Sequence, residues 1–184
     1  MRSSIEKTGK LYLHLGCGDV LLPGFLNMDI REEVGPDKIS LVYPIDYDDN
    51  LFDLVYASHI LEHFPGKQTV NVLQEWVRIL KPGGTLRISV PDFEAMVRIY
   101  RQTGDLSQVI GPMYGKQDYR YNYHSNIFDY KTLKKLMETA GLTAVHAWDF
   151  RRTEHSDHWD FSQAVTKGIP ISLNIEGRKK YGQK

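Results

Sequence analysis

The sequence predicts an α/β fold with a mostly parallel sheet. Short apolar runs alternate with longer segments in which apolar residues recur at helical spacing, and this alternation is typical of strands joined by crossover helices. The chain has 184 residues, of which 41% are apolar and 25% are charged, so it is long enough for one domain with a substantial core. We expect a polar tail over residues 1–10 and a single domain over residues 11–184.

Apolar runs bounded by glycine or polar residues predict the strands of the first third of the chain. These runs are Leu11–Cys17, Gly24–Ile30, Lys38–Pro44 and Phe52–Ser58. Only a handful of residues separate Gly18 from Phe25, whereas a parallel crossover usually takes about a dozen or more. We therefore expect the helix after the first strand to be shortened to a turn or absent.

The rest of the chain alternates helices with strands. An apolar face with helical spacing predicts a helix over Thr69–Leu80, which the KPGG sequence should end. Capping residues and glycine stops predict two further helices, and residues 105–126 are expected to be irregular. The further helices are Asp92–Gly104 and Asp129–Gly141, and the remaining strands are Thr85–Pro91, Thr143–Phe150 and Ile171–Gly177.

Charge, cysteine content and hydropathy limit the possible binding partners and cellular location of the protein. Lys+Arg and Asp+Glu both total 23, which argues against a nucleic-acid binder with a basic excess. A single cysteine, Cys17, excludes an intramolecular disulfide and fits a reducing cytoplasm. No apolar run approaches the length of a membrane span, and the first ten residues have no apolar signal core. We expect a cytoplasmic protein.

A glycine turn and an acidic residue indicate a nucleoside-containing cofactor. Gly16 and Gly18 follow the first strand and allow the backbone to turn sharply against a ligand. Asp29 ends the second strand, where a carboxylate can accept hydrogen bonds from ribose hydroxyls. A glycine pair alone is weak evidence, since it also occurs in ordinary tight turns, but Asp29 strengthens the prediction.

Four motifs in this order and spacing resemble a known family. LHLGCG, NMDI, FDLVYASHILEHF and RILKPGGTLRISVPD are similar to those of class I S-adenosylmethionine-dependent methyltransferases of a small type 11-like group. The resemblance implies a Rossmann-like seven-stranded sheet with an antiparallel last strand, and S-adenosylmethionine as cofactor. The sequence departs from the family at Val20, where a third glycine is usual, and at Ser40, where an acid is common.

The resemblance also implies positions for the cofactor. The methionine part would lie against Gly16, Cys17 and Gly18, and the ribose hydroxyls would be held by Asp29. The adenine would face Leu41 and Val42, and the sulfonium would lie near Ala57 and Ser58.

A metal is not expected, because no histidine or cysteine spacing matches a well-defined metal motif.

Histidines near the expected methyl group are candidate bases, since transfer to a hydroxyl benefits from a base of near-neutral pKa. His59 directly follows the fourth strand, and His63 lies one helical turn further on. His124 is the second candidate and lies in a tyrosine-rich stretch that also contains Tyr123. Such stretches are often binding loops, so we expect Tyr123 to contact the acceptor. The alternatives are structural hydrogen bonds for the histidines and an aromatic dimer contact for the loop.

The segment RRTEHSDHWDFS follows the last predicted parallel strand and should therefore lie at the cofactor edge of the sheet. We expect His155, Asp157 and His158 to orient acceptor hydroxyls, and Arg151 and Arg152 to meet a phosphate. The alternative is a charged loop outside the site.

The preferred function is methyl transfer from S-adenosylmethionine to a small-molecule or carbohydrate acceptor. The resemblance suggests a role in surface-polysaccharide biosynthesis. A catalytically inactive module that binds the cofactor or a protein partner is the alternative. A nicotinamide-dependent oxidoreductase is disfavoured, because Leu21 fills the last glycine position of the dinucleotide-binding pattern.

Overall fold

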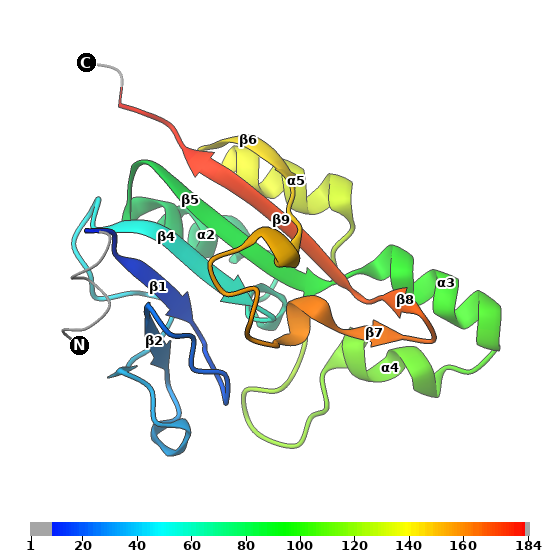
Figure 1. Cartoon of the computed structure of the whole chain (residues 1–184). Coiled ribbons are helices and arrows are strands. Elements are labelled where there is room, and N and C mark those ends of the chain that lie inside the picture. The colour runs from blue at the N-terminus through cyan, green and yellow to red at the C-terminus, as the bar shows by residue number, and fades with distance from the viewer. Residues whose placement is uncertain (1–8, 183–184) are drawn as a thin grey trace.

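A computed structural model describes residues 9–182 and contains a central seven-stranded sheet (Figure 1). The strand order is β3-β2-β1-β4-β5-β9-β6, and only β9 is antiparallel to its neighbours. The strands of this sheet are β1 (Tyr12–Leu15), β2 (Phe25–Asp29), β3 (Lys38–Ile39), β4 (Phe52–Ser58), β5 (Leu80–Pro91), β6 (Leu142–Ala147) and β9 (Ser172–Lys179). The predicted mostly parallel sheet with one antiparallel last strand is confirmed.

Four α-helices and several shorter elements complete the described part of the chain. The helices are α2 (Thr69–Arg78), α3 (Phe93–Thr103), α4 (Ser107–Tyr114) and α5 (Tyr130–Thr139). Two short strands, β7 (Val165–Thr166) and β8 (Ile169–Pro170), form a hairpin. Single 3₁₀ turns occur at η1 (Glu32–Val34), η2 (Leu61–His63), η3 (Phe150–Arg152) and η4 (Phe161–Gln163). Among the described residues, no helix combines the length and apolar character that crossing a membrane requires.

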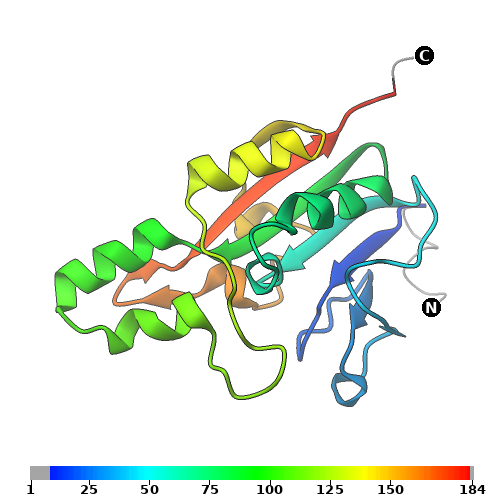
Figure 2. The same ribbon diagram turned by 180° about the vertical axis from the view of Figure 1, so that it is seen from behind.

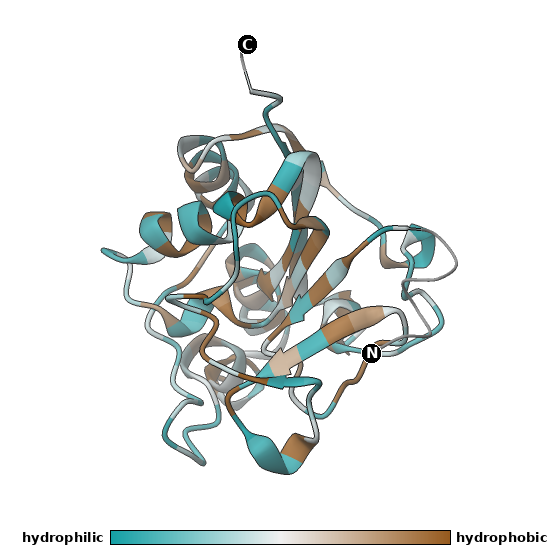
Figure 3. Cartoon of the chain, turned by 90° about the vertical axis from the view of Figure 1, so that its left-hand side faces the viewer, coloured by the Kyte–Doolittle hydropathy of each residue, from teal (hydrophilic) through white to brown (hydrophobic). Residues whose placement is uncertain are grey.

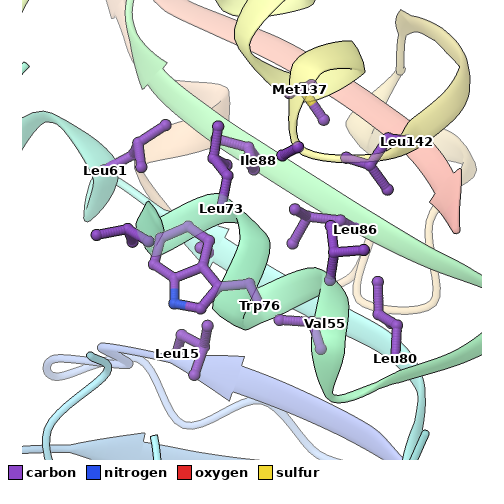
Figure 4. Close-up of a cluster of buried hydrophobic side chains, with 14 of the residues drawn as sticks. Leu15, Val55, Leu61, Leu73, Trp76, Leu80, Leu86, Ile88, Met137 and Leu142 are labelled. Atoms are coloured by element: carbon purple, nitrogen blue, oxygen red, sulfur yellow. The ribbon is translucent and has the colours of Figure 1, made fainter. Parts of the chain in front are cut away.

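One face of the sheet is covered by α2 and α5 (Figure 2). Leu15 and Val55 point from the strands to this face, and Trp76 and Leu73 of α2 pack on them (Figure 4). The Trp76 ring is fully buried, and its Nε1 donates to the carbonyl of Val42 at 2.9 Å. Hydrophobic residues run through the central strands, while the loops are mainly hydrophilic (Figure 3). The sheet–helix interface is therefore the main core of the protein.

The opposite face lacks the helix that usually follows β1. The chain passes directly from the turn after Leu15 into β2 at Phe25, which confirms the shortened crossover. Residues 148–164, orange in Figure 1, cross this face instead. Trp148 and His155 pack there against Tyr56, and the Tyr56 hydroxyl donates to Asp160. The segment after β6 therefore covers apolar surface that the missing helix leaves open.

Three local predictions need correction. Residues 105–126 were expected to be irregular, but Ser107–Tyr114 forms α4. The predicted strand Lys38–Pro44 is reduced to β3, which has two residues. The KPGG sequence follows the end of α2 as expected but belongs to β5, because Leu80 pairs with Phe52 before the strand register shifts. The tail predicted for residues 1–10 lies mostly outside the described residues.

Candidate active site

A cavity of about 970 Å³ lies at the carboxyl ends of the central parallel strands. Several segments far apart in the sequence line it. They include Gly16–Val20, Asp29–Arg31, Ser40–Tyr43, Ser58–Ile60, Tyr119–Ser125 and Trp159–Phe161. This edge of an open parallel sheet is where ligands usually bind, and the cavity has the size of a site for a cofactor together with a small acceptor.

The turn after β1 is built around two glycines with left-handed backbone. Gly16 has φ +59° and Gly18 has φ +54°, a conformation that costs other residues about 1–2 kcal/mol. A Cβ on Gly16 would lie only 2.1 Å from Cδ1 of Ile60. The glycine turn is therefore in direct contact with Ile60, and both line the cavity.

Asp29 ties this turn to the end of β2. Its Oδ2 accepts from the N–H of Gly18 at 2.8 Å, and its Oδ1 accepts from the N–H of Arg31 at 2.8 Å. The Arg31 guanidinium lies 5.4 Å from the Tyr119 ring centroid. Oδ1 also accepts from Arg31 Nε at 3.4 Å. A carboxylate offers about four acceptor sites, so Asp29 retains capacity for a ribose hydroxyl. The carboxylate, the glycine turn and the cavity together fit a nucleoside-containing cofactor.

Not every predicted cofactor residue reaches the cavity. Leu41 and Val42 line it, as does Ser58 at the end of β4. Ala57 instead points to the α2 side of the sheet and is fully buried in the core, so its predicted contact with the sulfonium is corrected. Cys17 lines the cavity, but burial raises the pKa of its thiol to about 12. A thiol that stays protonated is a packing residue rather than a nucleophile.

His59 lies beside the cavity in a left-handed conformation, with φ +55°. Ser172 Oγ donates to the carbonyl of Phe161 at 2.6 Å, and therefore accepts from His59 Nε2 at 2.9 Å. His59 Nδ1 lies 3.3 Å from Oε1 of Glu62, at ion-pair distance. Both ring nitrogens therefore face protein groups, which leaves His59 poorly placed to take a proton from an acceptor.

Glu62 is a site residue that the sequence analysis missed. Its side chain is fully buried, and neither carboxylate oxygen has a hydrogen-bond partner among the described residues. Burial alone would raise the pKa of this carboxyl, but the contact with His59 and the charges of the neighbouring histidines lower it on balance. The available signal was its spacing, because a residue three positions after His59 can lie on the same side of a helical turn.

His63 and His124 approach this carboxylate from two different segments. His63 Nδ1 donates to the carbonyl of Tyr123 at 3.1 Å, and His124 Nδ1 donates to the carbonyl of Pro112 at 2.8 Å. The ring centroids are 4.9 Å apart with an interplanar angle of 88°. His124 Nε2 lies 3.9 Å from Oε1 of Glu62. Burial lowers the pKa of His124, outweighing the opposing effect of Glu62, so the ring favours the neutral form.

The backbone holds the two segments in register. The carbonyl of Glu62 accepts from the N–H groups of Ser125 and Asn126 at 2.8 and 3.1 Å. The Asn126 side chain also donates to Thr69 Oγ1 at 3.0 Å, at the start of α2. These bonds fasten the loop that carries His124 to the 3₁₀ turn that carries Glu62. We call Glu62 and its three histidine neighbours, His59, His63 and His124, the His–Glu cluster.

The acceptor residues expected between Arg151 and Ser162 need correction. His155 is 1% exposed and stacks in the layer over Tyr56, so it cannot orient an acceptor. His158, Asp157, Arg151 and Arg152 are exposed and do not line the cavity. The same segment instead supplies Trp159 and Phe161, which are 59% and 51% exposed and line the cavity together with Tyr123. Both residues are plainly apolar in the sequence, but the prediction was based on the charged residues and histidines beside them.

Comparisons with known proteins bear on the fold and on the sequence pattern of the chain. Residues 27–88 match the family model described as a methyltransferase domain. No curated protein matches the chain significantly. An S-adenosylmethionine-dependent methyltransferase from Thermotoga maritima is similar with a TM-score of 0.59 and 18% identity, over 97% of this chain and 88% of that chain. A second, from Methanosarcina mazei, has a TM-score of 0.61 and 14% identity, over 94% and 93%.

A Bordetella parapertussis protein is also similar, with a TM-score of 0.60 and 14% identity. The match covers 94% of this chain, but the chain spans only 62% of that protein. At such identities the structural likeness speaks for the fold, and the family model adds the sequence pattern of residues 27–88. The resemblance seen in the sequence is thus confirmed: the chain has the fold of class I S-adenosylmethionine-dependent methyltransferases and carries the sequence pattern of their type 11 methyltransferase domain.

Proposed function

We propose that the protein transfers a methyl group from S-adenosylmethionine to a hydroxyl group of a small-molecule or carbohydrate acceptor. The observation that carries the proposal is a single cavity shared by two sets of residues. The glycine turn and Asp29 line this cavity, and so do His59, His63 and His124. One set suits a nucleoside, and the other suits a reacting hydroxyl.

The cofactor would be held largely by the backbone. The turn at Gly16, Cys17 and Gly18 would lie against its methionine part, and Asp29 would accept from a ribose hydroxyl through its remaining acceptor site. Leu41 and Val42 would flank the adenine. When bound, the cofactor supplies a methyl group on a positively charged sulfur. Ser58 ends β4 directly before His59, and both line the cavity, so the acceptor would be held beside them.

Of the two candidate bases, His124 fits the role better than His59. His124 donates through Nδ1, so its Nε2 lone pair is free to accept a proton, and burial favours the neutral ring. The acceptor oxygen forms the new bond to the methyl carbon, the electron pair of the carbon–sulfur bond goes to sulfur, and the hydroxyl proton goes to His124 Nε2. Glu62, 3.9 Å away, stabilises the resulting imidazolium.

Exposed aromatic rings favour a carbohydrate as the acceptor. Tyr123, Trp159 and Phe161 line the cavity and are each at least half exposed. Flat aromatic rings can stack on the apolar faces of sugars, and the polar tips of Tyr123 and Trp159 can also form hydrogen bonds. We therefore place the sugar ring between these aromatic residues and the His–Glu cluster.

Binding of S-adenosylhomocysteine tests the cofactor half of the proposal. We expect micromolar affinity by titration calorimetry, and an affinity at least about 10-fold weaker in Asp29→Asn, since a hydrogen bond to a charged group contributes about 1.5–3 kcal/mol. Asp48→Asn is the matched control, because Asp48 is exposed and does not line the cavity. Absence of binding to the wild-type protein would remove the proposal.

Methyl uptake tests the acceptor half. The protein should transfer radiolabelled methyl from S-adenosylmethionine to at least one member of a panel of sugar nucleotides. His124→Ala should lower kcat by about 100-fold or more while leaving S-adenosylhomocysteine affinity unchanged. Cofactor binding without uptake by any acceptor would instead favour an inactive cofactor-binding module.

A further inference from the structure

We propose that Glu62, His63 and His124 bind one divalent transition-metal ion at the acceptor end of the cavity. Each residue offers one ligand atom, and these atoms all lie within 4.8 Å of one another. Two imidazole nitrogens and one carboxylate oxygen form a donor set that catalytic zinc and non-haem iron sites use. The sequence spacing alone gave no sign of this site, because His124 comes from a distant loop.

The two histidines are oriented as metal ligands usually are. Each donates its Nδ1 proton to a backbone carbonyl, His63 to Tyr123 and His124 to Pro112. Such bonds fix the tautomer and leave Nε2 as the ligand atom. The planes of the two rings are nearly perpendicular, with an interplanar angle of 88°. The backbone bonds from Ser125 and Asn126 to Glu62 hold both segments in place before any ion binds.

The burial of Glu62 provides an independent indication that this site binds a cation. A fully buried carboxylate is costly unless it is paired or coordinates a metal. Neither oxygen of Glu62 has a hydrogen-bond partner among the described residues. Two ring nitrogens lie in ion-pair range of its Oε1, His59 Nδ1 at 3.3 Å and His124 Nε2 at 3.9 Å. A divalent ion between Glu62, His63 and His124 would neutralise the carboxylate and use the free lone pairs of both rings.

The donor set selects the kind of ion. Magnesium and calcium prefer oxygen ligands only, whereas imidazole suits zinc, iron and other late first-row metals. Three protein ligands leave at least one coordination position open. The open position would lie beside the cavity, because His63 and His124 both contribute to its lining.

The ion would activate the acceptor hydroxyl for the proposed methyl transfer, and this part of the inference rests on the proposed function. A hydroxyl bound to a divalent ion has a lowered pKa, so it loses its proton to bulk water before its oxygen attacks the methyl carbon. The carbon–sulfur electron pair again goes to sulfur. His124 then serves as a ligand, and direct proton transfer to its Nε2 is no longer required.

The test uses the full-length, tag-free protein after treatment with EDTA and dialysis. Co²⁺ is added in steps, and the visible absorption of the bound ion is followed, with Zn²⁺ as a competitor. We expect one Co²⁺ per chain, displaced by Zn²⁺. His63→Ala, His124→Ala and Glu62→Gln should each weaken Co²⁺ binding by at least about 10-fold. His146→Ala is the control, because His146 is exposed on β6 and lies outside the His–Glu cluster.

S-adenosylhomocysteine affinity, measured on the same samples, separates this inference from the proposed function. Variants that lose Co²⁺ but keep S-adenosylhomocysteine support the metal site in an intact fold. Co²⁺ binding without S-adenosylhomocysteine binding would uphold the site and remove the methyltransferase proposal. No saturable Co²⁺ or Zn²⁺ binding, or equal binding by His124→Ala and His146→Ala, would overturn the metal site.

Discussion

The imidazole ring of His155 packs on the phenol ring of Tyr56, with centroids 4.4 Å apart and an interplanar angle of 35°. Tyr56 points from β4 to the face of the sheet that has no first crossover helix. His155 therefore belongs to a covering layer, and its place in a charged segment does not make it an acceptor ligand. Phe25 and Trp148 pack edge-on against the same imidazole.

Replacing His155 tests this structural role. Both of its ring nitrogens lack hydrogen-bond partners among the described residues, and such buried polar atoms cost about 1–3 kcal/mol each. His155→Leu, of similar volume, should therefore keep the free energy of unfolding within about 1 kcal/mol of the wild type. His155→Ala should lose about 2–4 kcal/mol through a cavity. Urea unfolding measures both values.

His158→Ala is the control for these variants, because His158 is exposed three residues away. We expect a change within about 0.5 kcal/mol. S-adenosylhomocysteine affinity should be unchanged in all three variants. If His155→Leu unfolded as easily as His155→Ala, and also lost methyl uptake, the ring would belong to the site after all.

Stability should fall in mild acid because two buried histidines resist protonation. Burial lowers the pKa of His14 and of His155 to about 4 from an unfolded value of 6.5. Between these pH values the unfolded chain binds more protons than the folded chain, so the free energy of unfolding falls as pH drops from 6.5 to 4. Each ring contributes at most about 1.4 kcal/mol per pH unit.

Urea unfolding at several pH values measures this slope, and His155→Leu isolates one ring. The variant should show a shallower decline than the wild type between pH 6.5 and 4, and the same flat profile above pH 6.5. Equal slopes in the two proteins would mean that His155 is protonated freely in the folded state.

The sequence was sufficient to predict most of the sheet, because its signals were local. The apolar runs at Leu11 and Phe52, and the capping residues Asp92 and Asp129, mark elements that the structure contains. The helix α4 was missed because Gly111 and Pro112 lie inside it, and both residues are normally signs of a loop. Tertiary packing overrides that local preference through Val109, which is buried against α3.

The site was only partly predictable, for a different reason. Gly16, Gly18 and Asp29 could be inferred because each ends a predicted strand or follows one, and strand ends meet at one edge of the sheet. The proximity of Glu62 to His124 depends on how a loop after α4 returns to the sheet, and no spacing encodes that path. The burial of His155 depends in turn on the missing first helix, whose face needed another cover.

Cys17 should be unreactive in the folded protein. The thiol is 4% exposed, and burial raises its pKa to about 12, so almost no thiolate is present at neutral pH. We expect labelling by a disulfide reagent at pH 8 to be at least about 100-fold slower than in urea. Rapid labelling of the native protein, unaffected by S-adenosylhomocysteine, would show that the turn opens readily and is not a preformed cofactor site.

The contact between Gly16 and Ile60 should control both stability and cofactor binding. Gly16→Ala adds a Cβ that meets Ile60 Cδ1 at 2.1 Å and must also adopt φ +59°. The conformational part costs about 1–2 kcal/mol, and Gly104→Ala measures it alone, because Gly104 has φ +64° and no atom within 4 Å of its Cβ position. Gly16→Ala should therefore lower the free energy of unfolding more than Gly104→Ala does, and it should weaken S-adenosylhomocysteine binding.

In an Ile60→Ala background the cost of Gly16→Ala should fall to that of Gly104→Ala, since the steric part is relieved. Equal costs of Gly16→Ala in both backgrounds would mean that Ile60 moves aside freely, and the turn would then not be held against the His–Glu cluster by this contact.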